Sequence, residues 1–197
     1  MDLTEKMLKT EEVFDGKVIH VYNDEVRLPN GGTGTREVVR HSGGACVCAI
    51  DENMEIAFVR QFRYAYGMEL LELPAGKLEK GEEPLYAAAR ELREEAGLAA
   101  EDLLALGEMY PSPGYTDEII HMFLAVGAKP CDANPDEDEF LRIEKMYIGD
   151  ALDMVFKGEI KDAKTQICLM KAYIMIQSLG EQGMQLAADG EPSEPLN

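Results

Sequence analysis

The chain of 197 residues has few cationic side chains for its length. It carries 19 lysines and arginines against 38 aspartates and glutamates, which gives a formal net charge of −19. A charge of this sign and size repels nucleic-acid backbones and anionic lipid surfaces at long range. We therefore expect neither nucleic acid nor a membrane as a partner. A small anionic ligand stays compatible with the composition, because a bound cation and a few arginines can reverse the potential locally.

Cysteine and long apolar runs are also scarce. The four cysteines form no CxxC pair and no cluster with histidine, and no segment resembles a signal peptide or an apolar membrane span. These absences exclude disulfide frameworks and membrane-spanning classes, and they predict a protein of the reducing cytoplasm. With 46% hydrophobic residues, the chain can bury a full core without disulfides or a structural metal.

Local patterns predict a mixed α and β chain whose first third is rich in strands. Alternating residues and turn signals predict an antiparallel meander of strands over 18–28, 35–41, 45–50 and 56–62, and further strands over 69–73, 103–110, 119–126 and 141–148. Helices are predicted from Pro84 to just before Gly97, and over 149–156 and 162–179. From about Gly180 onward, the Gly, Glu, Pro and Ser content predicts a frayed tail.

The helix that begins at Pro84 concentrates acidic residues against local preference. Glu91, Glu94 and Glu95 fall on one edge of its apolar face, because successive helical residues turn by about 100°. Glu91 and Glu95 repel each other as an i,i+4 pair, and the helix C-terminus disfavours anions. One interpretation is a solvated acidic surface. The other is a site for Mg²⁺ or Mn²⁺, since no His or Cys is present to favour zinc.

A longer motif surrounds these glutamates. Gly76 is followed after five residues by Glu82, and after seven more by the run RELREEAGL over 90–98. This matches the Nudix box, G-x5-E-x7-R-E-U-x-E-E-x-G-U with U aliphatic, at every specified position. The ADP-ribose pyrophosphatase branch has a proline about fifteen residues beyond the box, and Pro113 lies there. The chain also resembles that branch in the segments VRQFRY (59–64), ELPAG (72–76), SPGYTDE (112–118) and DEDEF (136–140).

The resemblance implies a fold and a division of the chain. The fold is the α+β class in the form of the Nudix α/β/α sandwich, with a mixed central sheet flanked by helices. Residues 1–44 are expected as an N-terminal antiparallel β extension that forms a homodimer, residues 45–180 as the Nudix hydrolase domain, and residues 181–197 as a flexible C-terminal tail.

The resemblance also implies an activity. It is the metal-dependent hydrolysis of the pyrophosphate bond of ADP-ribose by an activated water, which yields AMP and ribose 5-phosphate. Two alternatives are a pyrophosphatase of another nucleotide sugar, such as GDP-mannose, and a non-catalytic ADP-ribose sensor. The expected cofactor is Mg²⁺, with Mn²⁺ as a substitute and two or three ions at the site.

The box residues take their expected roles from the family. Metal ligands are the Ala75 carbonyl, Glu91 and Glu95, and Glu94 is a further ligand or a supporting catalytic carboxylate. Residues expected to support the structure of the site are Gly76, Glu82, Arg90 and Gly97. The two glycines would permit loop and cap geometries that a Cβ forbids.

The remaining candidates lie outside the box. The general base is expected in a mobile loop, with Glu139 as first choice and Glu137 as second, and a solvated acidic loop is the alternative. Arg63 is either a phosphate contact or a surface charge. Residues expected at the substrate are Ser112 and Glu118, near the terminal ribose and phosphates, and Tyr22, as a weak candidate for the adenine pocket in a chain without tryptophan. His41 and His121 are isolated, and we expect them to be structural.

Overall fold

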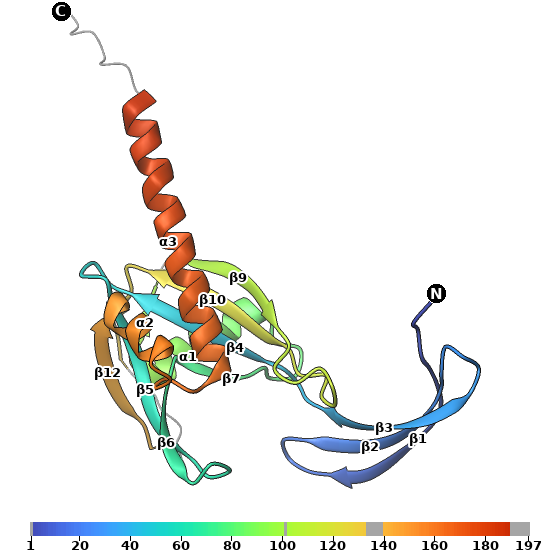
Figure 1. Cartoon of the computed structure of the whole chain (residues 1–197). Coiled ribbons are helices and arrows are strands. Elements are labelled where there is room, and N and C mark those ends of the chain that lie inside the picture. The colour runs from blue at the N-terminus through green and yellow to red at the C-terminus, as the bar shows by residue number, and fades with distance from the viewer. Residues whose placement is uncertain (1, 101, 133–139, 190–197) are drawn as a thin grey trace, which may run out of the picture.

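The computed structural model describes residues 2–100, 102–132 and 140–189, with side chains up to residue 180. An N-terminal sheet lies to one side of the main body (Figure 1). It consists of three antiparallel strands in sequence order, β1 (Lys6–Asp15), β2 (His20–Arg27) and β3 (Thr33–Arg40).

The main sheet has seven strands in the order β12-β5-β4-β10-β9, with β6 paired to β5 and β7 paired to β4. Strands β4 and β10 are parallel and the other pairs are antiparallel, so the predicted mixed sheet is confirmed. The strands are β4 (Gly44–Ile50), β5 (Glu55–Arg63), β6 (Met68–Glu72), β7 (Ala75–Lys77), β9 (Leu103–Met109), β10 (Ile120–Val126) and β12 (Arg142–Tyr147). A separate short pair joins β8 (Leu98–Ala99) to β11 (Lys129–Pro130).

Helices cover both faces of the main sheet: α1 (Pro84–Ala96), α2 (Ile148–Phe156) and α3 (Ala163–Asp189). Alternate residues of the fully buried β4 point to opposite faces. Cys46 and Cys48 pack in a core cluster with α2 and α3, whereas Val47 packs in a second cluster with Ala88 and Leu92 of α1. The core is therefore divided by the sheet into two layers, which confirms the α/β/α arrangement.

The structure differs from the predicted elements in two places. Strand β1 was not predicted, because every residue in it is exposed and it therefore lacks an alternation of buried and exposed positions. The predicted four-strand meander is wrong, since β3 ends the N-terminal sheet and β4 begins the main one. Between them Gly43 has a φ of 80°, which turns the chain out of the first sheet.

At the C-terminal end, α3 runs to Asp189. The helix thus continues into the segment from residue 181 for which a tail was predicted, and residues 190–197 lie outside the described part of the chain. None of the described helices is long and apolar enough to cross a membrane.

Candidate active site

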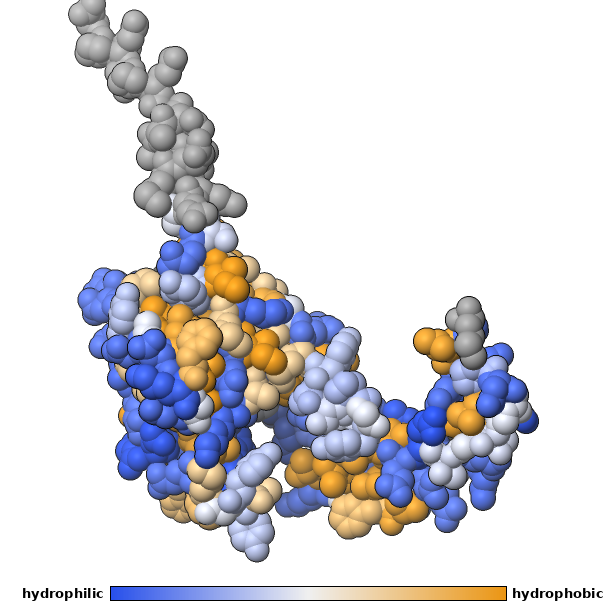
Figure 2. Space-filling view, viewed as in Figure 1, coloured by the Kyte–Doolittle hydropathy of each residue, from blue (hydrophilic) through white to orange (hydrophobic). Residues whose placement is uncertain are grey.

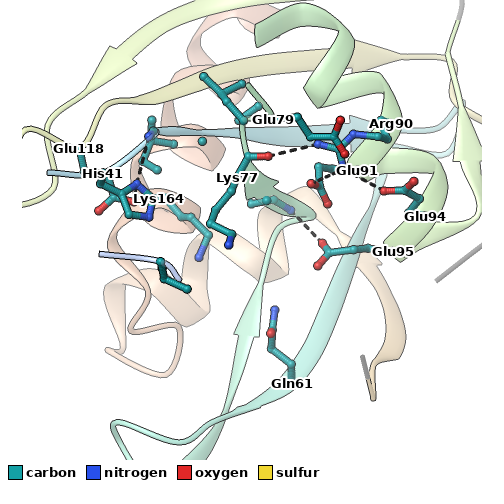
Figure 3. Close-up of a pocket in the computed structure, with 18 of the residues that line it drawn as sticks. His41, Gln61, Lys77, Glu79, Arg90, Glu91, Glu94, Glu95, Glu118 and Lys164 are labelled. Carbon is teal, nitrogen blue, oxygen red and sulfur yellow. Dashed lines mark hydrogen bonds and ion pairs between the residues drawn. The ribbon is translucent and has the colours of Figure 1, made fainter. Parts of the chain in front are cut away.

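A pocket of about 680 Å³ lies where the start of β4, strand β7, helix α1 and the first turn of α3 meet (Figure 3). The glutamates that line its described wall are Glu79, Glu91, Glu94, Glu95 and Glu118. The lysines and arginines that line it are Arg63, Lys77, Arg90 and Lys164. The pocket therefore offers carboxylates for a cation and cations for an anion.

Helix α1 positions three of the glutamates because its ends and its buried stripe are well defined. Pro84 stands in its first turn, and Gly97 at its C-cap has a φ of 61° and donates its N–H to carbonyls of the last turn. Glu91 and Glu95 lie beside the apolar stripe and are only 7% and 5% exposed. Burying two neighbouring carboxylates is costly unless other groups offset their charge.

Glycines bring the strand β7 within contact distance of this helix. A Cβ at Gly76 would overlap the carboxylate of Glu91, so the space that a side chain would fill there holds the glutamate instead. A Cβ at Gly44 would lie 2.7 Å from the carbonyl oxygen of Gly76. Strand β7 therefore lies close to β4 at Gly44 and close to α1 at Gly76.

Arg90 joins the glutamates of the box into one network. Its Nη1 donates to Glu91 at 2.7 Å and to Glu94 at 2.9 Å, while Nε and Nη2 each donate to Glu82 at 3.0 Å. These hydrogen bonds raise the pKa of Arg90 and lower the pKa of Glu82. Nη2 also donates to the carbonyl of Lys77. The contacts are those that a supporting role of Arg90 and Glu82 requires, and the role itself stays a prediction.

The predicted metal ligands lie next to one another. The Ala75 N–H donates to Oε2 of Glu95 at 2.9 Å, and Glu91, Glu94 and Glu95 all line the pocket on the side of α1 (Figure 3). The donor atoms are oxygens, the carboxylates are crowded, and Gly76 leaves room for them. This donor set fits a hard divalent cation such as Mg²⁺.

A different set of charged residues forms the opposite side of the pocket. Arg63 donates to both carboxylate oxygens of Glu72, from Nε and from Nη2, at 2.7 Å each. Lys164 also bonds to Glu72, whose side chain is 1% exposed. Burial opposes ionisation of Glu72, but the hydrogen bonds from Arg63 and the charge of Lys164 outweigh it and lower its pKa. Arg63 therefore reaches the pocket wall with its guanidinium already bound.

The first turn of α3 anchors the segment that precedes Gly76. Thr165 Oγ1 accepts a hydrogen bond from the Leu73 N–H at 2.9 Å and donates to Asp162 at 2.6 Å. Asp162 in turn accepts the Thr165 N–H at 2.9 Å, as a helix N-cap does. The position of the segment that leads to Gly76 thus depends on α3 as well as on α1.

Comparison with protein families covers residues 5–165 of the chain. The NUDIX domain family matches residues 40–165, and the family described as nucleoside diphosphate sugar hydrolase N-terminal domain matches residues 5–39. The chain belongs to the Nudix family. The described lining residues of its pocket lie in the segment matched by the NUDIX domain, except for Val18, and the glutamates of α1 are those of the Nudix box.

Curated relatives support this assignment, and a solved structure shares the fold. The chain is 45% identical to an ADP-ribose pyrophosphatase of Bacillus subtilis over 83% of its own length and 89% of the relative's. It is 42% identical to the methanol dehydrogenase activator of Bacillus methanolicus, over 88% and 94% of the two chains. The crystal structure of an ADP compounds hydrolase shares the fold, with a TM-score of 0.81, 20% identity, and coverage of 91% of this chain and 98% of the other.

In this Nudix protein the loop after β9 is tied to the N-terminal sheet. The Val39 N–H donates to the carbonyl of Tyr115, and the Asp117 N–H donates to the carbonyl of Val39. The Asp117 carboxylate accepts from the His41 N–H at 2.9 Å and from Arg40 at 3.1 Å. This anchoring holds the end of the loop, and with it Glu118, at the pocket.

The structure does not bring all the predicted substrate residues to the Nudix pocket. Glu118 and Arg63 line it, whereas Ser112 and Tyr22 are not among the described residues of its wall. The carbonyl of Ser112 closes the turn that follows it, and Tyr22 lies on β2 of the N-terminal sheet.

The predicted general bases, Glu137 and Glu139, lie outside the described residues. Strand β12 begins just beyond that segment, with Arg142 opposite Arg60 of β5. The residues that follow Arg60 on β5 include pocket-lining ones, so the chain re-enters the described structure beside a strand of the pocket.

Sequence reasoning missed His41 as a pocket residue. Its side chain lines the wall, and its Nδ1 accepts a hydrogen bond from the Gly43 N–H at 3.0 Å. Because Nδ1 is an acceptor, the neutral ring carries its proton on Nε2. The signal was the His-Ser-Gly-Gly run that leads into the buried strand β4, since adjacent glycines mark a close approach of backbones.

A separate cluster of potential ligand atoms lies on the N-terminal sheet. The side chains of Glu12, Asp15 and His20 place ligand atoms within 4.8 Å of one another. The two carboxylates are exposed and Asp15 already bonds to His20, so this cluster lacks the burial seen around the Nudix glutamates.

Proposed function

We propose that this Nudix protein hydrolyses the pyrophosphate bond of ADP-ribose with an activated water, releasing AMP and ribose 5-phosphate. The observation that carries the proposal is the meeting of Glu91, Glu94 and Glu95 with the Ala75 loop on one side of a pocket that has cations on the other. The 45% identity to an ADP-ribose pyrophosphatase supports the choice of substrate.

The residues that would hold the cation are Glu91, Glu95 and the Ala75 carbonyl, with Glu94 as a further ligand or supporting carboxylate. We propose Mg²⁺, replaceable by Mn²⁺, with two or three ions at the site. When bound, such ions offset the charge of the pyrophosphate and lower the pKa of water. Arg90 orients the carboxylates through its hydrogen bonds, and the Ala75 N–H holds Glu95 in place.

The proton of the attacking water needs an acceptor. We assign this role to the carboxylate of Glu139, with Glu137 as the second choice, because relatives in the ADP-ribose pyrophosphatase branch take their base from this loop beyond the box. Glu118 and His41 stand on the pocket wall beside each other, with Glu118 Oε1 3.6 Å from His41 Nδ1, where they can contact the substrate.

A homodimer is part of the proposal. All residues of β1 are exposed, and Met7, Val13 and Phe14 are apolar side chains at least half exposed. Figure 2 shows apolar side chains on the surface of the N-terminal sheet. A second copy would cover this surface and could carry Tyr22 toward the adenine pocket of its partner. We also place the protein in the reducing cytoplasm, because the four cysteines of the chain are free.

Product analysis tests the function. Purified protein with Mg²⁺ and ADP-ribose in ¹⁸O-labelled water should release AMP and ribose 5-phosphate, one of them carrying the label. If a panel of nucleotide sugars shows faster turnover of GDP-mannose than of ADP-ribose, GDP-mannose is the substrate instead. Binding of ADP-ribose for hours without release of AMP would identify a sensor instead of an enzyme.

A further inference from the structure

Most cationic side chains on the described pocket wall are already bound to carboxylates. Arg63 donates twice to Glu72 at 2.7 Å. Lys164 pairs with the same glutamate and lies 3.0 Å from Asp162. Arg90 is held by the glutamates of the Nudix box. The charge of each of these cations is therefore largely offset before any ligand enters.

Lys77 differs from these three. Its side chain is exposed and lines the pocket, and no carboxylate of the described residues pairs with its ammonium group. Its backbone is nevertheless held in place, since Lys77 is paired with Gly44 across β7 and β4 and its carbonyl accepts from Arg90 Nη2 at 3.2 Å. Because the backbone of Lys77 is fixed and its ammonium group has no carboxylate partner among the described residues, Lys77 places a positive charge at a defined part of the pocket.

The direction of this side chain follows from strand geometry. Successive residues of a strand point to opposite sides, and the position of Gly76 faces the carboxylate of Glu91. Lys77 therefore points away from α1. Figure 3 shows it between the acidic side chains of α1 and the side where Lys164 and His41 lie. Lys77 therefore faces the space between the glutamates of α1 and the part of the wall that carries Lys164.

The bound cations are poor choices for contact with the substrate. If Arg63 or Lys164 turned toward a phosphate, Glu72 would lose a partner although its side chain is only 1% exposed. Removing either cation would weaken the charge compensation of this buried carboxylate, which costs stability. Lys77 carries no such penalty, because its ammonium group gives up only water.

We propose that Lys77 binds the pyrophosphate group of the substrate, on the side of that group that faces away from the carboxylates of α1. The inference rests on the proposed function, since it takes a nucleotide-sugar pyrophosphate as the ligand. An ammonium group is a compact charge with three rotatable donors, so it can follow phosphate oxygens without requiring one bidentate geometry. Arg63 then has the separate role of neutralising Glu72 beside the pocket.

The test compares Lys77→Met and Lys77→Arg with Lys80→Met as a matched control. Lys80 is exposed, lies three residues beyond Lys77 in the chain, and is outside the described pocket wall. With ADP-ribose and Mg²⁺, Lys77→Met should raise KM about tenfold, which corresponds to about 1.4 kcal/mol, while kcat changes less than about threefold. Lys77→Arg should restore most of the affinity, and Lys80→Met should match the wild type.

Calorimetry with a substrate analogue separates this inference from the proposed function. The probe is α,β-methylene ADP-ribose, which cannot be cleaved, in the presence of Mg²⁺. A Kd raised about tenfold in Lys77→Met alone supports the contact, even if the wild type fails to hydrolyse ADP-ribose. Equal Kd values in Lys77→Met and wild type, or an equal loss in Lys80→Met, would overturn it. A wild type that does not bind the analogue would overturn both proposals.

Discussion

The main-chain N–H of Ala75 donates a hydrogen bond of 2.9 Å to Oε2 of Glu95. The bond joins the loop before the Nudix box to the last turn of α1, and Gly76 brings the same loop against Glu91. The loop and the helix therefore position each other. A change on either side is expected to disturb the proposed cation site before it disturbs the fold.

Glu95→Gln tests the proposed ligand. The amide oxygen can still accept the Ala75 N–H, so we expect thermal unfolding within a few degrees of the wild type, while the loss of the negative charge lowers kcat about 10²-fold or more. Steady-state kinetics over a range of Mg²⁺ and Mn²⁺ concentrations measures this. Glu108→Gln, at an exposed position on β9, is the control. A Glu95→Gln enzyme with wild-type kinetics would remove Glu95 from the ligand set.

Gly76→Ala tests the close approach of β7 and α1. The new Cβ would overlap the carboxylate of Glu91, so either the loop or the glutamate must move. We expect the protein to fold with a stability lower by about 1–3 kcal/mol and activity lower by about 10²-fold. Gly114→Ala meets open space and should change neither. Denaturant unfolding and kinetics on both variants measure the two effects.

Glu72→Gln tests the charged side of the pocket through the pH dependence of stability. The folded protein holds the pKa of Glu72 below its ordinary value of 4.5, so it binds fewer protons there than the unfolded chain does. The ionised glutamate therefore stabilises the fold above pH 4.5, and this contribution is lost as the pH falls through the lowered pKa. At pH 7 the variant should be about 3 kcal/mol less stable, because a neutral amide replaces the buried carboxylate that Arg63 and Lys164 share.

The difference in unfolding free energy between Glu72→Gln and wild type should shrink when urea unfolding is repeated below pH 4.5. Glu69→Gln, an exposed change on the same strand β6, should stay within about 0.5 kcal/mol of the wild type at both pH values. A difference for Glu72→Gln that is constant with pH would show that its ionisation does not contribute.

Glu139→Gln tests the proposed general base. The variant should retain binding of Mg²⁺ and of α,β-methylene ADP-ribose, but kcat should fall about 10²-fold or more, because the amide cannot take a proton from water. Glu137→Gln serves as the comparison. If Glu139→Gln turns over near the wild-type rate and Glu137→Gln is inactive, the role belongs to Glu137.

Local geometry allowed the catalytic helix to be predicted from the sequence. Pro84, Gly97 and the spacing of the apolar residues determined where α1 begins and ends, and the helical period alone placed Glu91 and Glu95 on one buried edge. The Nudix box also indicated the family, because this motif is defined by the spacing of residues along the chain. Strands with regular alternation were predicted for the same reason, whereas the uniformly exposed β1 was not.

Contacts between distant segments were determined only by the tertiary structure. Glu72 meets Lys164 across 92 residues, and Arg40 meets Asp117 across 77, and neither pairing has a local signal. The pairing of β5 with β6 brings Arg63 to Glu72, and the packing of distant segments brings His41 and Lys164 to the same pocket wall. The chemical types of the site residues follow from the chain, but their partners depend on how the sheet and α3 pack.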